Sequence, residues 1–91
     1  RIEAVTADGF HHPVFEGAKF ELIFANILAG PLITLAPEIA ARLEAGGRII
    51  LSGLLEEQSD KVEAAYDAEG LSLIDKAILD GWATLVYASK A

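Results

Sequence analysis

The chain has 91 residues, of which 53% are hydrophobic, and it carries a formal net charge of −7 without a single cysteine. A chain of this length is one domain or part of one, and its hydrophobic content excludes a disordered tail. The acidic balance disfavours a nucleic-acid partner, and the missing cysteines exclude disulfides and thiolate chemistry.

No apolar run approaches the roughly 20 residues that a membrane-spanning helix needs. We therefore expect a soluble, cytoplasmic protein without a membrane partner. The chain also contains no methionine and begins at Arg1, which predicts a truncated or processed product.

The first third of the chain contains two expected strands. Residues 1–6 are strand-like and end before Asp8 and Gly9, and residues 11–19 have no periodicity and are expected to form a loop. Residues 20–25 end in an unbroken apolar run. Runs of this kind are typical of strands that are covered on both faces, as in parallel sheets.

The hydrophobic period changes to that of a helix after Pro31, a residue that suits the first helical turn. Gly46 and Gly47 are expected to end this helix, because glycine accepts the left-handed conformation of a C-terminal cap. The apolar stripe recurs at i, i+3, i+4 and i+7 spacing, and it consists of Leu32, Leu35, Ala36, Ile39, Ala40 and Leu43.

The second half repeats the alternation of strand and helix. Residues 48–54 form the next buried strand, and a second helix follows that Gly70 closes; its stripe is Leu55, Ser59, Val62 and Tyr66. Residues 71–79 and 82–88 flank Asp80-Gly81, a hairpin dipeptide. The prediction is a mixed α/β sheet with a central βαβ unit and a carboxyl-terminal antiparallel hairpin.

Ligands of open α/β sheets bind beyond the carboxyl ends of the parallel strands. Three such ends are predicted, at Asp8-Gly9, at Asn26 and at Ser52-Gly53. Asn26 is the most informative, because a polar amide directly follows a buried strand. Two interpretations stay open at this point: a turn residue that bonds its own backbone, which spacing alone slightly favours, or a ligand contact.

Other polar residues have structural interpretations. His11 and His12 are adjacent and without further ligands at a suitable spacing, so we expect a solvated loop pair and no metal site. Glu56 and Glu57 suit the positive end of a helix dipole, and Ser52 has no histidine partner for nucleophilic catalysis. The remaining candidates are expected to pack in the core or on the sheet: Tyr66 and Trp82.

Residues 20–54, FELIFANILAGPLITLAPEIAARLEAGGRIILSGLL, together with Asp80-Gly81-Trp82, resemble the second half of the bacterial ribosomal-protein methyltransferase PrmA family. Asn-Ile-Leu-Ala after a strand is fairly specific to it, whereas Gly-Gly-Arg-Ile-Ile-Leu-Ser-Gly occurs more widely among class I methyltransferases. The resemblance implies that residues 1–91 are the carboxyl-terminal part of a catalytic domain. They would form a partial Rossmann-like class I methyltransferase sheet, from its third to its seventh strand.

The resemblance also implies functional roles. Asn26 would lie beside the methyl-bearing sulfonium of S-adenosylmethionine and, with the Ile27 carbonyl, would position the accepting amine. Asp8 and Gly9 would lie near the adenine end of the cofactor pocket. The substrate would be a large-subunit ribosomal protein, methylated on lysine or N-terminal amines. The Gly-rich cofactor loop would lie upstream of Arg1, so we expect weak or no cofactor binding and no activity from this chain alone.

Losing two upstream strands would leave residues 22–25 with unpaired backbone groups at a sheet edge, and such edges invite association. We therefore expect self-association through this edge. Two other function classes stay open: a stand-alone dimerising α/β interaction module without catalysis, and part of a nucleotide-dependent oxidoreductase, for which no motif is present.

Overall fold

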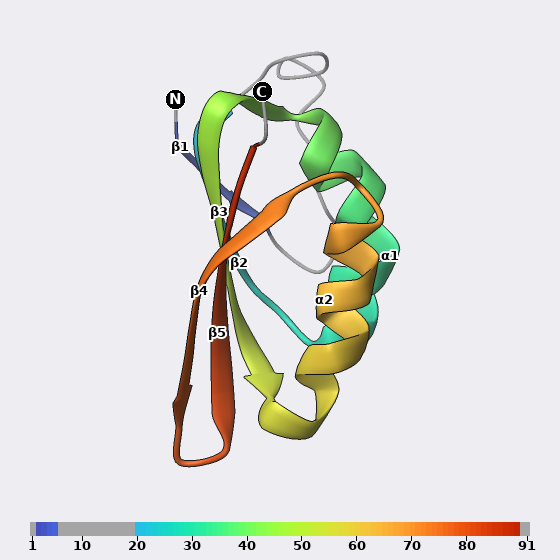
Figure 1. Ribbon diagram of the computed structural model, residues 1–91, viewed down its shortest axis with the longest axis vertical. Coiled ribbons are helices and arrows are strands. Elements are labelled where there is room, and N and C mark those ends of the chain that lie inside the picture. Colours follow the sequence, from blue (N-terminus) through green and yellow to red (C-terminus); the bar gives the residue numbers. More distant parts are fainter. Residues whose placement is uncertain (1, 6–19, 90–91) are drawn as a thin grey trace.

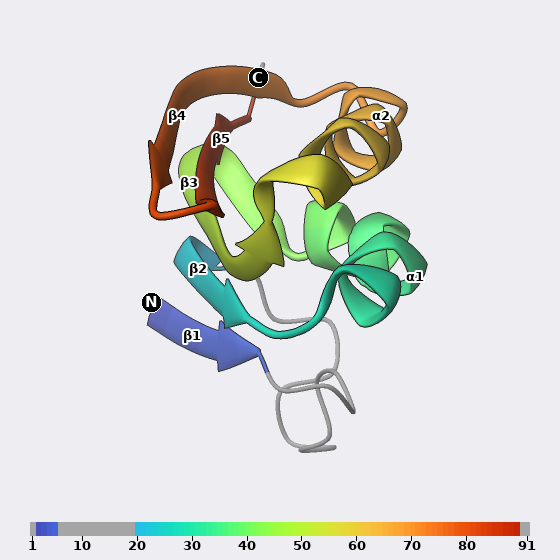
Figure 2. The same ribbon diagram turned by 90° about the horizontal axis from the view of Figure 1, so that it is seen from below.

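Five strands form one mixed sheet, and two α-helices pack against one of its faces (Figures 1 and 2). The computed structural model describes residues 2–5 and 20–89. In chain order the elements are β1 (Ile2–Val5), β2 (Phe20–Asn26), α1 (Ala29–Ala41), β3 (Leu43–Leu55), the 3-10 helix η2 (Glu56–Gln58), α2 (Ser59–Asp67), β4 (Ser72–Leu79) and β5 (Trp82–Ala88). The predicted α/β alternation is confirmed.

The sheet has the strand order β1-β2-β3-β5-β4. β1, β2 and β3 are parallel, and β5 runs antiparallel to both β3 and β4. The predicted βαβ unit and the predicted hairpin are therefore present. Asp80 and Gly81 have φ values of 51° and 81°, and a two-residue turn with both values positive matches the right-handed twist of the strands that it joins.

The core lies between the sheet and the two helices. Strand side chains alternate between faces, and those of β2, β3 and β5 that point toward the helices are buried, as are the inner faces of α1 and α2. Removing a large apolar side chain from water in this way contributes about 1.5–3 kcal/mol to folding. The fully buried members of this core include Ile23, Leu32, Ile39, Ile49, Leu51, Leu54, Val62, Tyr66, Leu85 and Tyr87.

Two tyrosines connect the helices to the sheet. The buried hydroxyl of Tyr66, on α2, donates to the Leu32 carbonyl of α1 over 2.9 Å. The ring of Tyr66 lies 5.6 Å, centroid to centroid, from that of Tyr87 on β5, whose hydroxyl donates to Asp67 Oδ1 over 3.0 Å. Because the rings are apolar and both hydroxyls are bonded, burial of these residues leaves no polar group unsatisfied. Tyr66 is thus a core residue, as predicted.

Replacing Tyr66 with phenylalanine is expected to lower the free energy of unfolding by about 1 kcal/mol at neutral pH, the usual net value of one hydrogen bond. Burial raises the pKa of the Tyr66 hydroxyl above its ordinary value, which is about 10 in an unfolded chain. Its contribution is therefore complete below about pH 10 and is lost as the pH rises toward the folded-state pKa. Urea unfolding of both forms between pH 7 and 11 measures this, and Tyr66→Phe should show the shallower decline. An equal decline of the free energy of unfolding in both forms would show that Tyr66 does not cause this pH dependence.

The first helix ends earlier than its glycines indicate. α1 stops at Ala41, with Arg42 as its C-cap, and Gly46-Gly47 lies within β3. Leu43, expected on the helical stripe, instead pairs with Phe20 of β2, and the Phe20 N–H donates to the Arg42 carbonyl over 2.7 Å. This pairing with a distant strand extends the chain immediately after Arg42, so the prediction that Gly46-Gly47 ends the helix is wrong.

The expected unpaired edge at residues 22–25 is also absent. β1 pairs in parallel with β2, with Ile2 opposite Leu22 and Val5 opposite Ala25, so both sides of β2 have backbone partners. The reason is topological, since β1 occupies the position beside β2 that the prediction left empty. The argument for self-association through this edge therefore does not hold.

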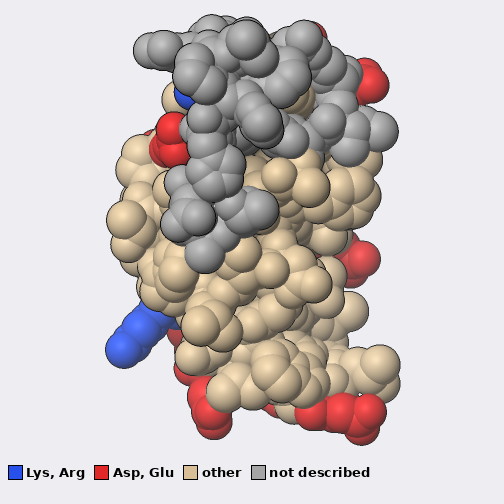
Figure 3. Space-filling model, turned by 180° about the vertical axis from the view of Figure 1, so that it is seen from behind, with Lys and Arg blue, Asp and Glu red and all other residues tan. Residues whose placement is uncertain are grey.

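The helices cover one face of the sheet only, within the part of the chain that the structure describes (Figure 2). On the opposite face Phe24 is 42% exposed, and Leu22, Ile50 and Val86 are half-buried. Figure 3 views the molecule from behind Figure 1, and so from the β1 side of the sheet (Figure 2), and much of the described surface in this view is uncharged. The apolar run of β2 predicted cover on both faces, and the second face has no covering helix among these residues.

Candidate functional site at the carboxyl edge of the sheet

Asn26 is the last residue of β2 and pairs in register with Ser52 of β3. It therefore stands at the carboxyl edge of the parallel strands, where ligands of open α/β sheets bind. Its side chain is exposed. Among the described residues, no hydrogen bond involves its carboxamide, so the turn interpretation, in which the amide bonds its own backbone, is not what this structure shows. With respect to the described residues, the carboxamide therefore has both its donor and its acceptor available.

The connection from Asn26 into α1 is short. Ile27 packs against the core, Leu28 is the N-cap and is 72% exposed, and α1 begins at Ala29. Leu28 makes no side-chain capping bond to this helix, and the first turn of α1 contains no acidic residue. The positive end of the α1 dipole thus begins three residues after Asn26, with no acidic residue in the first turn of the helix, and it disfavours a positive charge nearby by about 0.3–1 kcal/mol.

β3 supplies the other side of the site. Ser52 is half-buried opposite Asn26, and Gly53, with a φ of 84°, lies against both the Asn26 side chain and the Ile27 backbone. The sequence predicted Gly53 at a strand end, but it did not predict that Gly53 contacts Asn26 and Ile27. The available signal was a glycine directly after a strand-end polar residue, which often marks a close approach of backbone.

Two predicted site residues, Asp8 and Gly9, lie outside the described residues, as do His11 and His12, which are expected to form a solvated loop pair. The structure therefore brings together Asn26, Ile27 and the Ser52-Gly53 segment, and the predicted cofactor role of Asp8 and Gly9 stays a prediction. Within residues 2–5 and 20–89, no group of three or more acidic, histidine or cysteine side chains could hold a metal ion.

Glu56 and Glu57 lie in η2 rather than in the first turn of α2. The start of α2 is held by two other side chains: Gln58 Oε1 accepts the Leu55 N–H over 2.9 Å, and Ser59 Oγ donates to the Glu56 carbonyl over 2.8 Å. Trp82, expected in the core or on the sheet, begins β5 and is 53% exposed.

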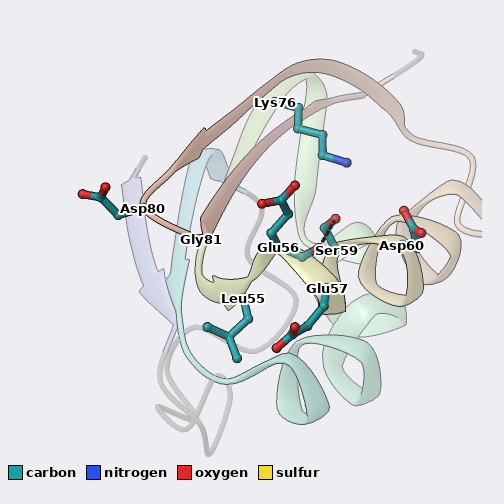
Figure 4. A pocket seen from close by; sticks show the side chains of 8 residues that line it. All are labelled: Leu55, Glu56, Glu57, Ser59, Asp60, Lys76, Asp80 and Gly81. Atoms are coloured by element: carbon teal, nitrogen blue, oxygen red, sulfur yellow. Dashed lines mark hydrogen bonds between the residues drawn. The ribbon is translucent and has the colours of Figure 1, made fainter.

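An acidic hollow of about 540 Å³ lies between η2, α2 and the β4–β5 hairpin (Figure 4). Its lining residues are Leu55, Glu56, Glu57, Ser59, Asp60, Lys76, Asp80 and Gly81. Lys76 pairs with Glu63 over 2.8 Å, and this hydrogen bond raises the pKa of Lys76. Asp80 points away from the hollow in Figure 4. Asn26 does not line it, so the hollow is a separate feature next to the strand edge.

The described helices are also too short or too polar to cross a membrane. This agrees with the absence of long apolar runs in the sequence.

Two solved structures share this arrangement. A ribosomal protein L11 methylase from Lactobacillus delbrueckii subsp. bulgaricus has a TM-score of 0.76 at 34% identity, over 81% of this chain and 38% of that one. A methyltransferase from Pyrococcus furiosus, at 17% identity, has a TM-score of 0.64 over 81% of this chain and 43% of that one. The described strands and helices therefore form part of a class I methyltransferase fold, as predicted.

Sequence comparison shows to which family of class I methyltransferases the chain belongs. Residues 2–90 match the family model described as ribosomal protein L11 methyltransferase (PrmA). The chain is 49% identical over 85 residues to the ribosomal protein L11 methyltransferases of Mesorhizobium japonicum and Brucella suis, which covers 92% of this chain and 29% and 30% of theirs. The chain belongs to the ribosomal protein L11 methyltransferase family. It spans about 30% of the length of these curated relatives.

Proposed function

We propose that residues 1–91 are the carboxyl-terminal part of the catalytic domain of a longer, S-adenosylmethionine-dependent methyltransferase, called here the full-length protein. Its substrate would be ribosomal protein L11 in the cytoplasm, methylated on lysine or N-terminal amines. The observation that carries the proposal is the carboxamide of Asn26 at the carboxyl edge of the sheet, which is exposed and has no hydrogen bond to any described residue, in a chain of this family. The chain alone would be inactive.

An amine must lose a proton before it can attack a methyl group. A lysine ammonium with an ordinary pKa of about 10.4 is mostly charged at neutral pH, and deprotonation at pH 7 costs about 4–5 kcal/mol. A site for amine methylation therefore needs groups that hold the neutral amine and direct its lone pair.

The carboxyl edge of β2 has features that suit this task. The Asn26 side-chain oxygen and the Ile27 carbonyl can each accept an N–H of the amine, and both lie beside Gly53. The start of α1, which has no side-chain cap from Leu28 and no acidic residue in its first turn, is close in sequence and disfavours the charged ammonium. Holding the amine in one orientation is positioning catalysis, which needs no general base.

The cofactor supplies the electrophilic methyl group when it is bound. Of the described residues, Asn26 is the one that fits a place beside it, because its carboxamide is exposed and without a hydrogen-bond partner among them. Asp8 and Gly9 are proposed to line the same cofactor pocket.

Transfer of a labelled methyl group from S-adenosylmethionine to purified ribosomal protein L11 tests the proposal. We expect the full-length protein to label the amines of its substrate, and we expect residues 1–91 alone to label nothing and to give no binding heat with S-adenosylmethionine in calorimetry. If the full-length protein transfers no label, the chain is a non-catalytic module. Methyl transfer by residues 1–91 alone would contradict the proposal that these residues hold only part of the active site.

On its own the chain is also expected to self-associate, through the sheet face that none of the described helices covers (Figure 2) rather than through an edge. Parallel strands are normally buried on both faces, and Phe24 is exposed here with half-buried Leu22 and Ile50 beside it. Sedimentation of residues 1–91 over a hundredfold concentration range, roughly what mass action needs to show an equilibrium, should reveal dimers. Phe24→Lys should weaken them, whereas Glu44→Lys, at an exposed position, should not. A monomer at every concentration would overturn this expectation.

A further inference from the structure

We propose that Gly53 is the positioning residue for the amine-binding pair, because its missing side chain determines where the Asn26 carboxamide and the Ile27 carbonyl lie. The proposal rests on the function proposed above. A Cβ atom at Gly53 would lie 2.5 Å from Asn26 Oδ1, 3.2 Å from the Ile27 carbonyl oxygen and 3.3 Å from the Ile27 nitrogen. One glycine therefore contacts both proposed acceptors.

The backbone at Gly53 explains how β3 comes so close. Its φ is 84°, a left-handed conformation that glycine adopts at little cost. The pairing of β3 with β5 shifts register between Leu51 and Leu54, so Ser52 and Gly53 form an irregularity of the β-bulge type. Bulges of this kind often occur beside active sites, where they redirect neighbouring groups.

A Cβ atom at position 53 would meet one side-chain group, the Asn26 carboxamide, and one backbone group, the Ile27 carbonyl. The Asn26 carboxamide is exposed and has no hydrogen bond within the described part of the chain, so a methyl group at position 53 would displace it rather than unfold the strand. The Ile27 carbonyl belongs to the backbone, and at 3.2 Å it would need to shift by only a few tenths of an ångström. A side chain at Gly53 should therefore misplace the acceptors and leave the fold intact.

The chain contains a matched control. Gly70 has a φ of 81° and follows α2, and a Cβ atom there would meet nothing within 4 Å. An alanine at position 70 carries the same backbone strain as one at position 53, but it contacts no part of the site. Comparing alanine at the two positions therefore separates the effect of backbone strain from the effect of displacing the Asn26 and Ile27 acceptors.

The experiment compares Gly53→Ala and Gly70→Ala in the full-length protein. We expect similar decreases in melting temperature for both variants. Gly53→Ala should lower kcat for methyl transfer by roughly 10²-fold, as a misplacement of about 1 Å can do, with little change in the KM for S-adenosylmethionine. Gly70→Ala should retain kcat. Equal kcat values for the two variants, or a Gly53→Ala protein that fails to fold where Gly70→Ala folds, would overturn the positioning role.

A second measurement does not depend on activity. The side-chain amide signals of Asn26 in ¹⁵N NMR spectra should move in Gly53→Ala and stay in place in Gly70→Ala. If the full-length protein transfers no methyl group but these signals move, the proposed function fails and the contact between Gly53 and Asn26 stands. Unmoved Asn26 signals in Gly53→Ala would overturn the inference itself.

Discussion

Replacing Asn26 with alanine in the full-length protein is expected to lower kcat for the proposed methylation of ribosomal protein L11 by about 10²–10³-fold, the range that follows if Asn26 is, as proposed, a preorganised polar group at the reacting centre. The fold should survive, because Asn26 is exposed at the end of β2 and has no hydrogen bond to another described residue. Steady-state kinetics together with thermal unfolding measure both effects. Full activity in Asn26→Ala would remove this residue from the mechanism.

The variant Asn26→Asp tests whether the site needs only an acceptor oxygen at position 26 or also needs an uncharged side chain there. Aspartate keeps an acceptor oxygen, but its negative charge raises the pKa of an amine nearby and so reduces the neutral fraction at pH 7. We therefore expect low activity at neutral pH that recovers as the pH rises, whereas Asn26→Ala should stay slow throughout. Identical pH profiles for the two variants would show that the Asn26 oxygen does not contact the amine.

Replacing Leu51 with alanine is expected to have the largest effect on stability. Leu51 is 0% exposed and lies at the centre of the sheet, with Ala25 opposite it on β2 and Leu85 opposite it on β5, both buried. Truncating a leucine at such a position costs about 2–5 kcal/mol. Domains of this size have about 5–15 kcal/mol in total, so a substantial part of the stability should be lost.

The control is Leu79→Ala, at the tip of the β4–β5 hairpin, where the leucine is 74% exposed. Both substitutions remove the same atoms, so their difference reports burial alone. Denaturant unfolding should place the midpoint of Leu51→Ala far below that of the unmodified chain and leave that of Leu79→Ala nearly unchanged. Equal losses would mean that β3 is not the centre of the core.

Local pattern determined much of this protein. The apolar run of β2, the helical stripe that begins after Pro31 and the Asp80-Gly81 turn each follow from residues close together in the chain, and each is present. The same pattern placed Asn26 at a strand end. Such features depend on side-chain period and turn chemistry, which neighbouring residues encode without reference to the rest of the fold.

Tertiary structure alone decided the remaining features. The end of α1 at Ala41, the pairing of β1 with β2 and the approach of Gly53 to Asn26 all depend on residues far apart in sequence. A glycine pair predicts a helix end from local propensity, but pairing of Leu43 with Phe20 extends the chain before those glycines are reached. Because such contacts form between elements rather than within them, no local period encodes them, and the geometry around Asn26 becomes visible only in the folded chain.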